Sequence, residues 1–140
     1  EVSNKLHEWH ESGQLPANKI CFDLYDCAAI DDIHSALGLM NQLRAIGYRF
    51  CLDHFGSERS PFAFLKALPF DIIKIDESFM EELNQAEGDE KAADSIIEIA
   101  HYLGKKVLAN AVDTAICLQK MKHLKVDFVQ GSSVSAYIDL

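Results

Sequence analysis

The feature that most constrains this 140-residue chain is a regular alternation of short apolar runs with longer segments of helical periodicity. Short apolar runs bounded by turn residues predict strands, and apolar residues that recur every three or four positions predict helices. Between residues 30 and 46, for example, apolar residues recur at that spacing, and Gly47 follows as a helix stop. The pattern predicts strands over residues 19–25, 48–55, 71–75, 105–112 and 126–131, and helices over residues 3–12, 30–46, 61–67, 89–103 and 114–123.

Strict alternation of strand and helix predicts βα units and a parallel sheet, an α/β fold. About five such units fit either an open doubly wound sheet or part of a (β/α)₈ barrel, and the pattern alone does not choose between them. Both architectures place ligands at the C-terminal ends of the strands. Because no linker, low-complexity segment or repeat divides the chain, we expect residues 1–140 to form a single domain.

Charge and hydropathy narrow the class of protein. The formal net charge of −9 argues against non-specific binding to nucleic acid or to an anionic membrane surface. No apolar run approaches the roughly 18 residues of a membrane-spanning helix, and the first residues lack the pattern of a signal peptide. The four cysteines form no C-x-x-C pair, which favours a cytoplasmic protein without structural disulfides or zinc.

Polar residues gather where the predicted strands end. In chain order they are Asp23 and Asp26, Asp53 and His54, Lys74 and Asp76, Asn110 and Asp113, and Gln130. In a parallel sheet covered on both faces, strand interiors should be nearly continuous apolar runs. Asp23 lies between Phe22 and Leu24, so it interrupts such a run, and Lys74 interrupts another. A charge in such a place must be paired or must bind something.

Two interpretations of these charges remain open at this point. In the structural one, Lys74 forms buried salt bridges to Asp53 or Asp23 that hold the sheet together. In the functional one, the strand ends form a carboxylate-rich mouth for a divalent cation, and Lys74 faces a phosphate or a metal-bound water. The oxygen donors of such a mouth suit a hard cation, whereas His54 suits a transition metal better. These donors are Asp23, Asp53, Asn110 and Gln130.

The same strand ends carry a family resemblance. FDLYD, LDHFG, FLKALPFDIIKIDESF, LANAVDT and DFVQG, which begin at residues 22, 52, 64, 108 and 127, resemble in order and spacing five motifs of EAL-type cyclic-di-GMP phosphodiesterase domains. The resemblance implies a TIM-like barrel, of which this chain would supply the C-terminal portion, about five βα units. The strands that bear the Glu-Ala-Leu signature and a metal-binding Asn would precede Glu1.

Carried over position by position, the resemblance assigns roles to the residues of the mouth. Asp23 matches a metal-binding Glu, and Asp53 matches the first Asp of an Asp-Asp pair that binds metal. Lys74 matches the catalytic-site lysine, and Gln130 matches an active-site Gln. Asn110 replaces a Glu that contacts the metal site. We therefore expect these five residues to line a ligand site, with Asp23 and Asp53 as weak metal ligands.

Three further positions match the family outside these five. His54 replaces the second Asp of the metal-binding pair. Asp26 stands where a Glu anchors the following loop, and Asp113 replaces a Glu tied to dimerisation. The family resemblance implies hydrolysis of cyclic di-GMP by a water held between two divalent cations. Because several anionic ligands are replaced or absent here, we expect Lys74 to be non-catalytic and the chain to be inactive, with no cofactor required.

The expected function is therefore a degenerate EAL domain that acts as a cyclic-di-GMP receptor or a regulatory protein-interaction module in bacterial signalling. Its expected partners are cyclic di-GMP, a second copy of the chain in a homodimer, and attached or partner signalling domains. One alternative is a phosphodiesterase that needs Mg²⁺ or Mn²⁺ and whose site is completed by upstream sequence. The other is a purely structural or dimerisation module.

Overall fold

The computed structural model describes residues 2–13, 16–25, 30–56 and 62–135, and its centre is a five-stranded parallel sheet. Each strand pairs in parallel with the next one in the chain. The strands are β1 (Cys21–Leu24), β2 (Arg49–Phe55), β3 (Ile72–Ile75), β4 (Lys106–Ala109) and β5 (Phe128–Val129). This arrangement confirms the predicted α/β fold with βα units.

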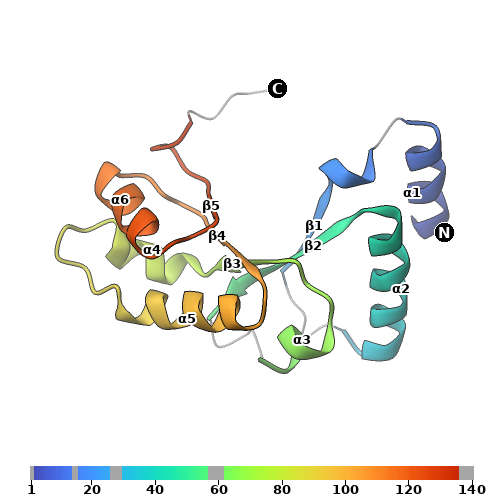
Figure 1. Ribbon diagram of the computed structural model, residues 1–140, viewed down its shortest axis with the longest axis horizontal. Helices are drawn as coiled ribbons and strands as arrows, with labels where there is room; N and C mark the ends of the chain where they lie inside the picture. Colours follow the sequence, from blue (N-terminus) through green and yellow to red (C-terminus); the bar gives the residue numbers. More distant parts are fainter. Residues whose placement is uncertain (1, 14–15, 26–29, 57–61, 136–140) are drawn as a thin grey trace.

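Helices flank the sheet, as Figure 1 shows. Five of them match predicted segments: α1 (Val2–Glu11), α2 (Ile33–Ile46), α3 (Phe62–Ala67), α5 (Lys91–Tyr102) and α6 (Ala115–His123). Helix α2 begins where Asp32 accepts hydrogen bonds from the backbone N–H groups of His34 and Ser35, and it ends at Gly47, whose φ is 116°. None of the described helices combines the length and the apolar character that crossing a membrane requires.

Two short elements were not predicted from the sequence. A 3₁₀ helix (Ala17–Lys19) occupies the start of the segment that was expected to be strand, so β1 is shorter than predicted. Helix α4 (Glu77–Leu83) follows β3 directly, and Asp76 caps its first turn by accepting a hydrogen bond from the backbone of Ser78. Because α4 has only seven residues, three of them glutamates, its apolar period is too short to stand out.

Burial alternates along β1, β3 and β4, and this alternation explains the charges that interrupt β1 and β3. In β3, Ile73 and Ile75 are buried, while Ile72 and Lys74 are half-buried. The buried face packs on the helices in one hydrophobic core. The opposite face, which we call the inner face, carries Asp23, Asp53 and Lys74. Only one face is therefore covered along most of the described sheet, which explains why Asp23 and Lys74 can interrupt the apolar runs of β1 and β3.

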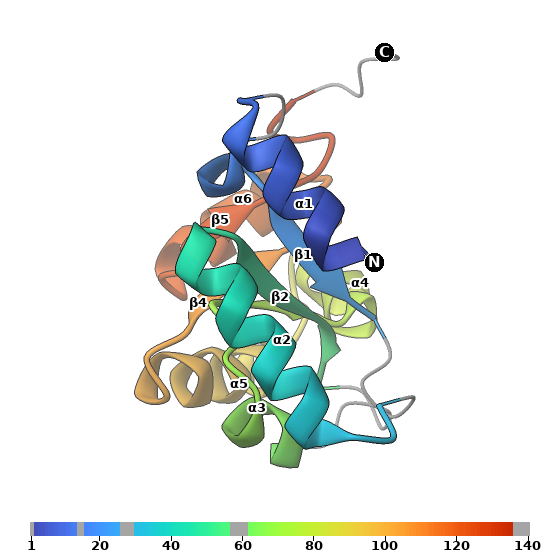
Figure 2. The ribbon, with the colours of Figure 1, turned by 90° about the vertical axis from the view of Figure 1, so that its right-hand side faces the viewer.

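The N-terminal helix is held against the rest of the fold by a buried hydrogen bond. Figure 2 shows α1 and α2 side by side in front of the sheet. The hydroxyl of Tyr48, which precedes β2 and is 1% exposed, donates to the carbonyl of Leu6 at 2.9 Å. A buried phenol needs such a partner, and here the partner is the backbone of α1. This contact fixes the position of α1 relative to β2.

Candidate functional site

An irregularity in β2 brings two polar side chains to the C-terminal end of the sheet. Leu52 pairs with Ile73 and Phe55 with Ile75, so β2 has one residue more than β3 between these two pairs. His54 has a φ of 53°, a left-handed conformation that is uncommon for residues other than glycine. A β-bulge of this kind redirects side chains beside it. Asp53 and His54 consequently both contribute to the same end of the sheet.

Lys74 lies between two of the predicted carboxylates. Its Nζ forms an ion pair with Asp23, and it donates to Asp53 Oδ2 at 3.1 Å. The side chains of Lys74 and Asp53 are 14% and 16% exposed, whereas that of Asp23 is 43% exposed. Burial alone would lower the pKa of the Lys74 ammonium, but its hydrogen bonds to Asp23 and Asp53 raise that pKa above the ordinary value. The lysine therefore stays charged at neutral pH.

His54 turns toward a second carboxylate beside this cluster. Its Nδ1 lies 2.9 Å from Asp76 Oδ2, and its ring meets that of Tyr25 edge-on, with centroids 4.4 Å apart. Asp76 Oδ1 accepts hydrogen bonds from the Ser78 backbone at 2.9 Å and hydroxyl at 2.5 Å. Burial alone would raise the pKa of Asp76, but the bonds from Ser78 and His54 lower it. Asp76 thus joins the start of α4 to the bulge in β2.

The last two residues of the predicted ligand site follow β4 and β5. Asn110 Nδ2 donates to Glu77 Oε1 at 3.3 Å, and its Oδ1 accepts from the Ala111 backbone at 2.8 Å. Gln130 is exposed, and its backbone bonds Ala109 on one side and Val112 on the other. Both residues lie at the C-terminal end of the sheet, as predicted, although neither has a hydrogen bond or ion pair with Lys74.

Asp113, one of the two remaining predicted positions, has different surroundings. Asp113 is exposed, and its Oδ1 accepts from the backbone of Ser132 at 3.0 Å and from its hydroxyl at 2.8 Å. These hydrogen bonds lower the pKa of Asp113. The carboxylate therefore ties the loop after β4 to the segment after β5, and its predicted part in dimerisation stays a prediction. Asp26 falls outside the described residues, so its predicted loop contact does too.

Sequence reasoning missed three residues that the structure places beside the cluster. Asp76 was noted at a strand end but was given no role, and Glu77 and Tyr25 were not considered. A signal for Asp76 was present, because Asp is a favoured N-cap residue and Asp76 directly follows an expected strand. The contacts of Tyr25 and Glu77 bridge separate βα units, and no local spacing predicts them.

The donor atoms fit a pair of divalent cations poorly. Two carboxylates, Asp23 and Asp53, lie together on the inner face, and Lys74 bonds both. Within the described ranges, no three His, Cys, Asp or Glu side chains are grouped so that they can hold a metal ion. The neighbouring polar groups are an imidazole directed at Asp76 and an amide directed at Glu77. Two closely spaced cations require more anionic ligands than this cluster offers.

Comparison with known proteins identifies the family to which this chain belongs. The EAL domain family matches residues 1–137, nearly the whole chain. The chain belongs to the EAL domain family. The resemblance seen in the sequence is thereby confirmed, and the sheet is part of a TIM-like barrel, which decides between the two architectures that the strand pattern left open.

Individual relatives of this EAL chain are similar over most of its length. Cyclic di-GMP phosphodiesterase PdeA of Borreliella burgdorferi is 30% identical over 118 residues, or 84% of the chain. Cyclic di-GMP phosphodiesterase PdeB of Shewanella oneidensis is 28% identical over 120 residues, or 86% of the chain. A solved EAL enzyme with cAMP and cyclic di-GMP bound is 27% identical and covers 97% of the chain, with a TM-score of 0.83.

These matches cover small parts of the relatives themselves. The chain spans 18% of the length of PdeA and 14% of that of PdeB. It spans 36% of the solved EAL enzyme. The comparisons therefore relate this region to cyclic-di-GMP phosphodiesterases without assigning it their activity.

Proposed function

We propose that this EAL region is a non-catalytic cyclic-di-GMP receptor or regulatory module in bacterial signalling. The observation that carries the proposal is the double ion pair of Lys74 with Asp23 and Asp53. In this arrangement the lysine ammonium lies between the two carboxylates that the family resemblance assigns to metal binding and offsets one of their two negative charges. The ammonium of Lys74 thus lies where a metal cation would otherwise be held between Asp23 and Asp53.

The substitutions around the cluster support the same proposal. His54 has its Nδ1 directed at Asp76, and Asn110 is a neutral amide that donates to Glu77. An amide cannot take a proton from water as a carboxylate does, so Asn110 is a poor substitute for a group that activates water. Since the donor set does not fit two divalent cations, we derive no hydrolytic step for this region.

A ligand can still use the polar end of the sheet. Cyclic di-GMP carries two phosphodiester charges and two guanine bases. Lys74 can contact a phosphate when the ligand displaces Asp23, whose side chain is 43% exposed, and Gln130 offers an exposed amide at the same end of the sheet. Tyr25, whose side chain is 63% exposed, offers an aromatic ring on which a base can stack. The solved EAL enzyme with cyclic di-GMP bound shows that a domain of this fold takes the ligand.

Calorimetric titration with cyclic di-GMP tests the proposal, both on this chain and on any longer protein that contains it. We expect the longer protein to bind, and Lys74→Gln to weaken its affinity at least about tenfold, because a charge-assisted contact to phosphate is lost. Lys122→Gln, which removes an exposed lysine on α6, serves as the matched control. Circular dichroism establishes that each variant is folded.

Hydrolysis assays with Mg²⁺ or Mn²⁺ separate the receptor from the enzyme. We expect no turnover at high protein concentration. Turnover by the longer protein that Lys74→Ala abolishes would replace the receptor with a phosphodiesterase completed by other sequence. Failure of both proteins to bind cyclic di-GMP would leave a structural or dimerisation module instead.

A further inference from the structure

A polar cavity lies at the opposite end of the strands from Lys74, where β2, β3 and β4 begin. Two adjoining hollows of about 630 and 340 Å³ share Arg44, Arg49 and Asp71 in their walls. We call them together the basal groove. Arg44 is in the last turn of α2, Arg49 begins β2, and Asp71 precedes β3. Three successive βα units therefore contribute to one depression.

The basal groove carries an excess of positive charge. Its walls include Arg44, Arg49, Lys105 and Lys106, and Asp71 is the one acid among the lining residues. Arg44 is paired with Asp71 at 2.8 Å, and Lys106 is paired with Asp127, outside the lining, at 2.7 Å. Two cations remain after these pairs cancel. That excess stands out because the formal net charge of the chain is −9.

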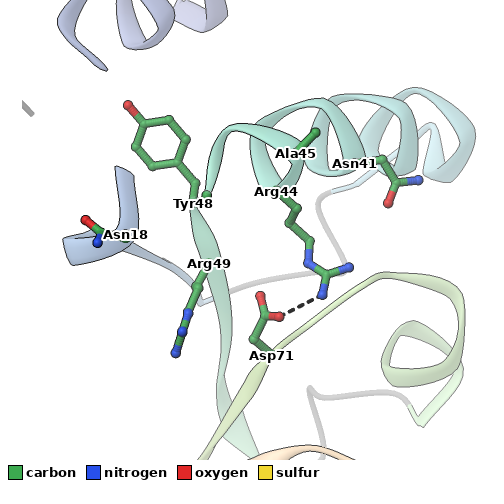
Figure 3. A pocket seen from close by; sticks show the side chains of 8 residues that line it. Asn18, Asn41, Arg44, Ala45, Tyr48, Arg49 and Asp71 are labelled. Atoms are coloured by element: carbon green, nitrogen blue, oxygen red, sulfur yellow. Dashed lines mark hydrogen bonds and ion pairs between the residues drawn. The ribbon is translucent and has the colours of Figure 1, made fainter. Parts of the chain in front are cut away.

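The two remaining cations have no partner among the described side chains. Arg49 is exposed and Lys105 is half-buried, and neither side chain has a hydrogen bond or ion pair within the described part of the chain. Figure 3 shows the guanidinium of Arg44 meeting Asp71, while Arg49 extends from the start of β2 without such a contact. The unmatched charge is therefore available to a ligand.

We infer that the basal groove binds a phosphate monoester, a small molecule whose phosphate is held by Arg49 and Lys105. Two uncompensated cations match a dianion better than a single carboxylate. A guanidinium presents paired N–H donors that fit the oxygens of phosphate. The groove exceeds the lower size limit of about 300 Å³ for small-molecule pockets, which leaves room for an organic group. Asn18 and Asn41 line the larger hollow and offer amides to that group.

This inference is independent of cyclic-di-GMP binding at the Lys74 end, because it concerns different residues at the other end of the strands. The bound phosphate would contact the start of β2 through Arg49 and the start of β4 through Lys105. A ligand that binds only the folded state raises the unfolding temperature by mass action. The unfolding temperature thus reports phosphate binding, and variants of the groove cations assign that binding to the groove.

Thermal unfolding and calorimetry with ribose 5-phosphate, ribose and inorganic phosphate at matched ionic strength test the inference. We expect ribose 5-phosphate to raise the unfolding temperature and ribose to leave it unchanged. An equal effect of inorganic phosphate would identify the anion alone as the ligand, and a smaller one would show that the organic group contributes. No shift with either phosphate would overturn the inference.

A charge-matched pair of double variants locates the site. Arg49→Gln with Lys105→Gln removes both groove cations without breaking a described side-chain contact, and we expect it to weaken binding at least about tenfold. Lys5→Gln with Lys122→Gln removes the same charge from α1 and α6, outside the groove, and should bind as the unaltered chain does. Equal phosphate binding by the two double variants would contradict the assignment of the binding site to the basal groove. If the double variant does not fold, Arg49→Gln alone and Lys105→Gln alone replace it, and unchanged phosphate binding by both single variants would contradict the site.

Discussion

At the scale of single residues, the main feature is a lysine that takes part in two ion pairs inside a sheet. The structural and functional interpretations of Lys74 both began from a charge in an apolar strand. The structure agrees with the structural interpretation, since Lys74 forms ion pairs with Asp23 and Asp53. The structure leaves the functional interpretation open, because the same three groups lie at the end of the sheet where parallel folds bind their ligands. One ion-paired cluster can therefore serve both stability and recognition.

Asp127 provides a residue-scale prediction about pH. Its Oδ1 accepts from Lys106 at 2.7 Å, while its Oδ2 accepts from the Val107 backbone and lies 2.9 Å from His101 Nε2. Burial alone would raise the pKa of Asp127, but these contacts lower it to about 2. Because the folded-state pKa is below the unfolded value, the charged carboxylate stabilises the fold at neutral pH, and this contribution is lost as the pH falls toward 2.

We expect Asp127→Asn to lower the free energy of unfolding at pH 7 by about 1 kcal/mol, after allowance for solvent screening. The difference from the unaltered chain should hold down to about pH 5 and shrink between about pH 4 and pH 2. Urea unfolding followed by circular dichroism at several pH values measures it. Asp31→Asn, which alters an exposed carboxylate, is the control. Equal stability of Asp127→Asn and the unaltered chain at pH 7 would contradict the prediction.

At the scale of elements, the closing turn after β5 depends on a glycine in close contact with backbone. A Cβ at Gly131 would lie 2.5 Å from both the nitrogen and the oxygen of Val112, and the φ of Gly131 is 155°. Val112 is itself tied to this segment, since its nitrogen donates to Gln130 and its carbonyl accepts from Ser133. Any side chain at this position would push the end of β5 away from the loop after β4.

We expect Gly131→Ala to lower the free energy of unfolding by about 2 kcal/mol or more, because overpacking against backbone has no flexible neighbour to absorb it. Gly38→Ala in α2 is a matched control with the opposite expected sign. Nothing lies within 4 Å of a Cβ at Gly38, so alanine should stabilise the helix by about 0.5–1 kcal/mol. Urea unfolding of both variants measures the two effects, and similar stabilities would refute the close approach at Gly131.

The sequence predicted element types better than their details, and particular residues show why. The helix from Ile33 to Ile46 has a long apolar period and a glycine stop, so its course follows from local information. The bulge at His54 does not, because it is defined by pairing with β3, which lies about twenty residues further along. The ion pairs of Lys74 were predicted as one of two options. The contact between His54 and Asp76 was not, because it depends on the direction in which the bulge turns the imidazole.

At the scale of the whole molecule, the open inner face of the sheet bears on association. Phe128 on β5 is 44% exposed, and Cys21 on β1 is exposed as well. β1 and β5 are the outermost strands of the described sheet. Unpaired strand edges beside exposed apolar side chains favour pairing with another chain. This supports the predicted homodimer, which the structure of one chain does not test.

We expect light scattering to give twice the chain mass of 15.7 kDa at high concentration and to show dissociation on dilution. Phe128→Lys should weaken the dimer, because it places a charge on the edge strand. Tyr102→Lys is the matched control, since Tyr102 is 90% exposed on α5. If Asp113→Lys disrupts the dimer and Phe128→Lys does not, the interface uses the loop after β4. A monomer at every concentration would contradict dimerisation through the β5 edge and through the loop after β4.

The order of the strands in space is the same as their order along the chain. Within the described sheet, no strand therefore has to be inserted between two earlier ones, and each new βα unit needs only the preceding unit as its template. Most long-range pairings consequently join segments that leave the ribosome one after another. Such a topology suits folding during synthesis, in which each strand docks as soon as its neighbour is in place.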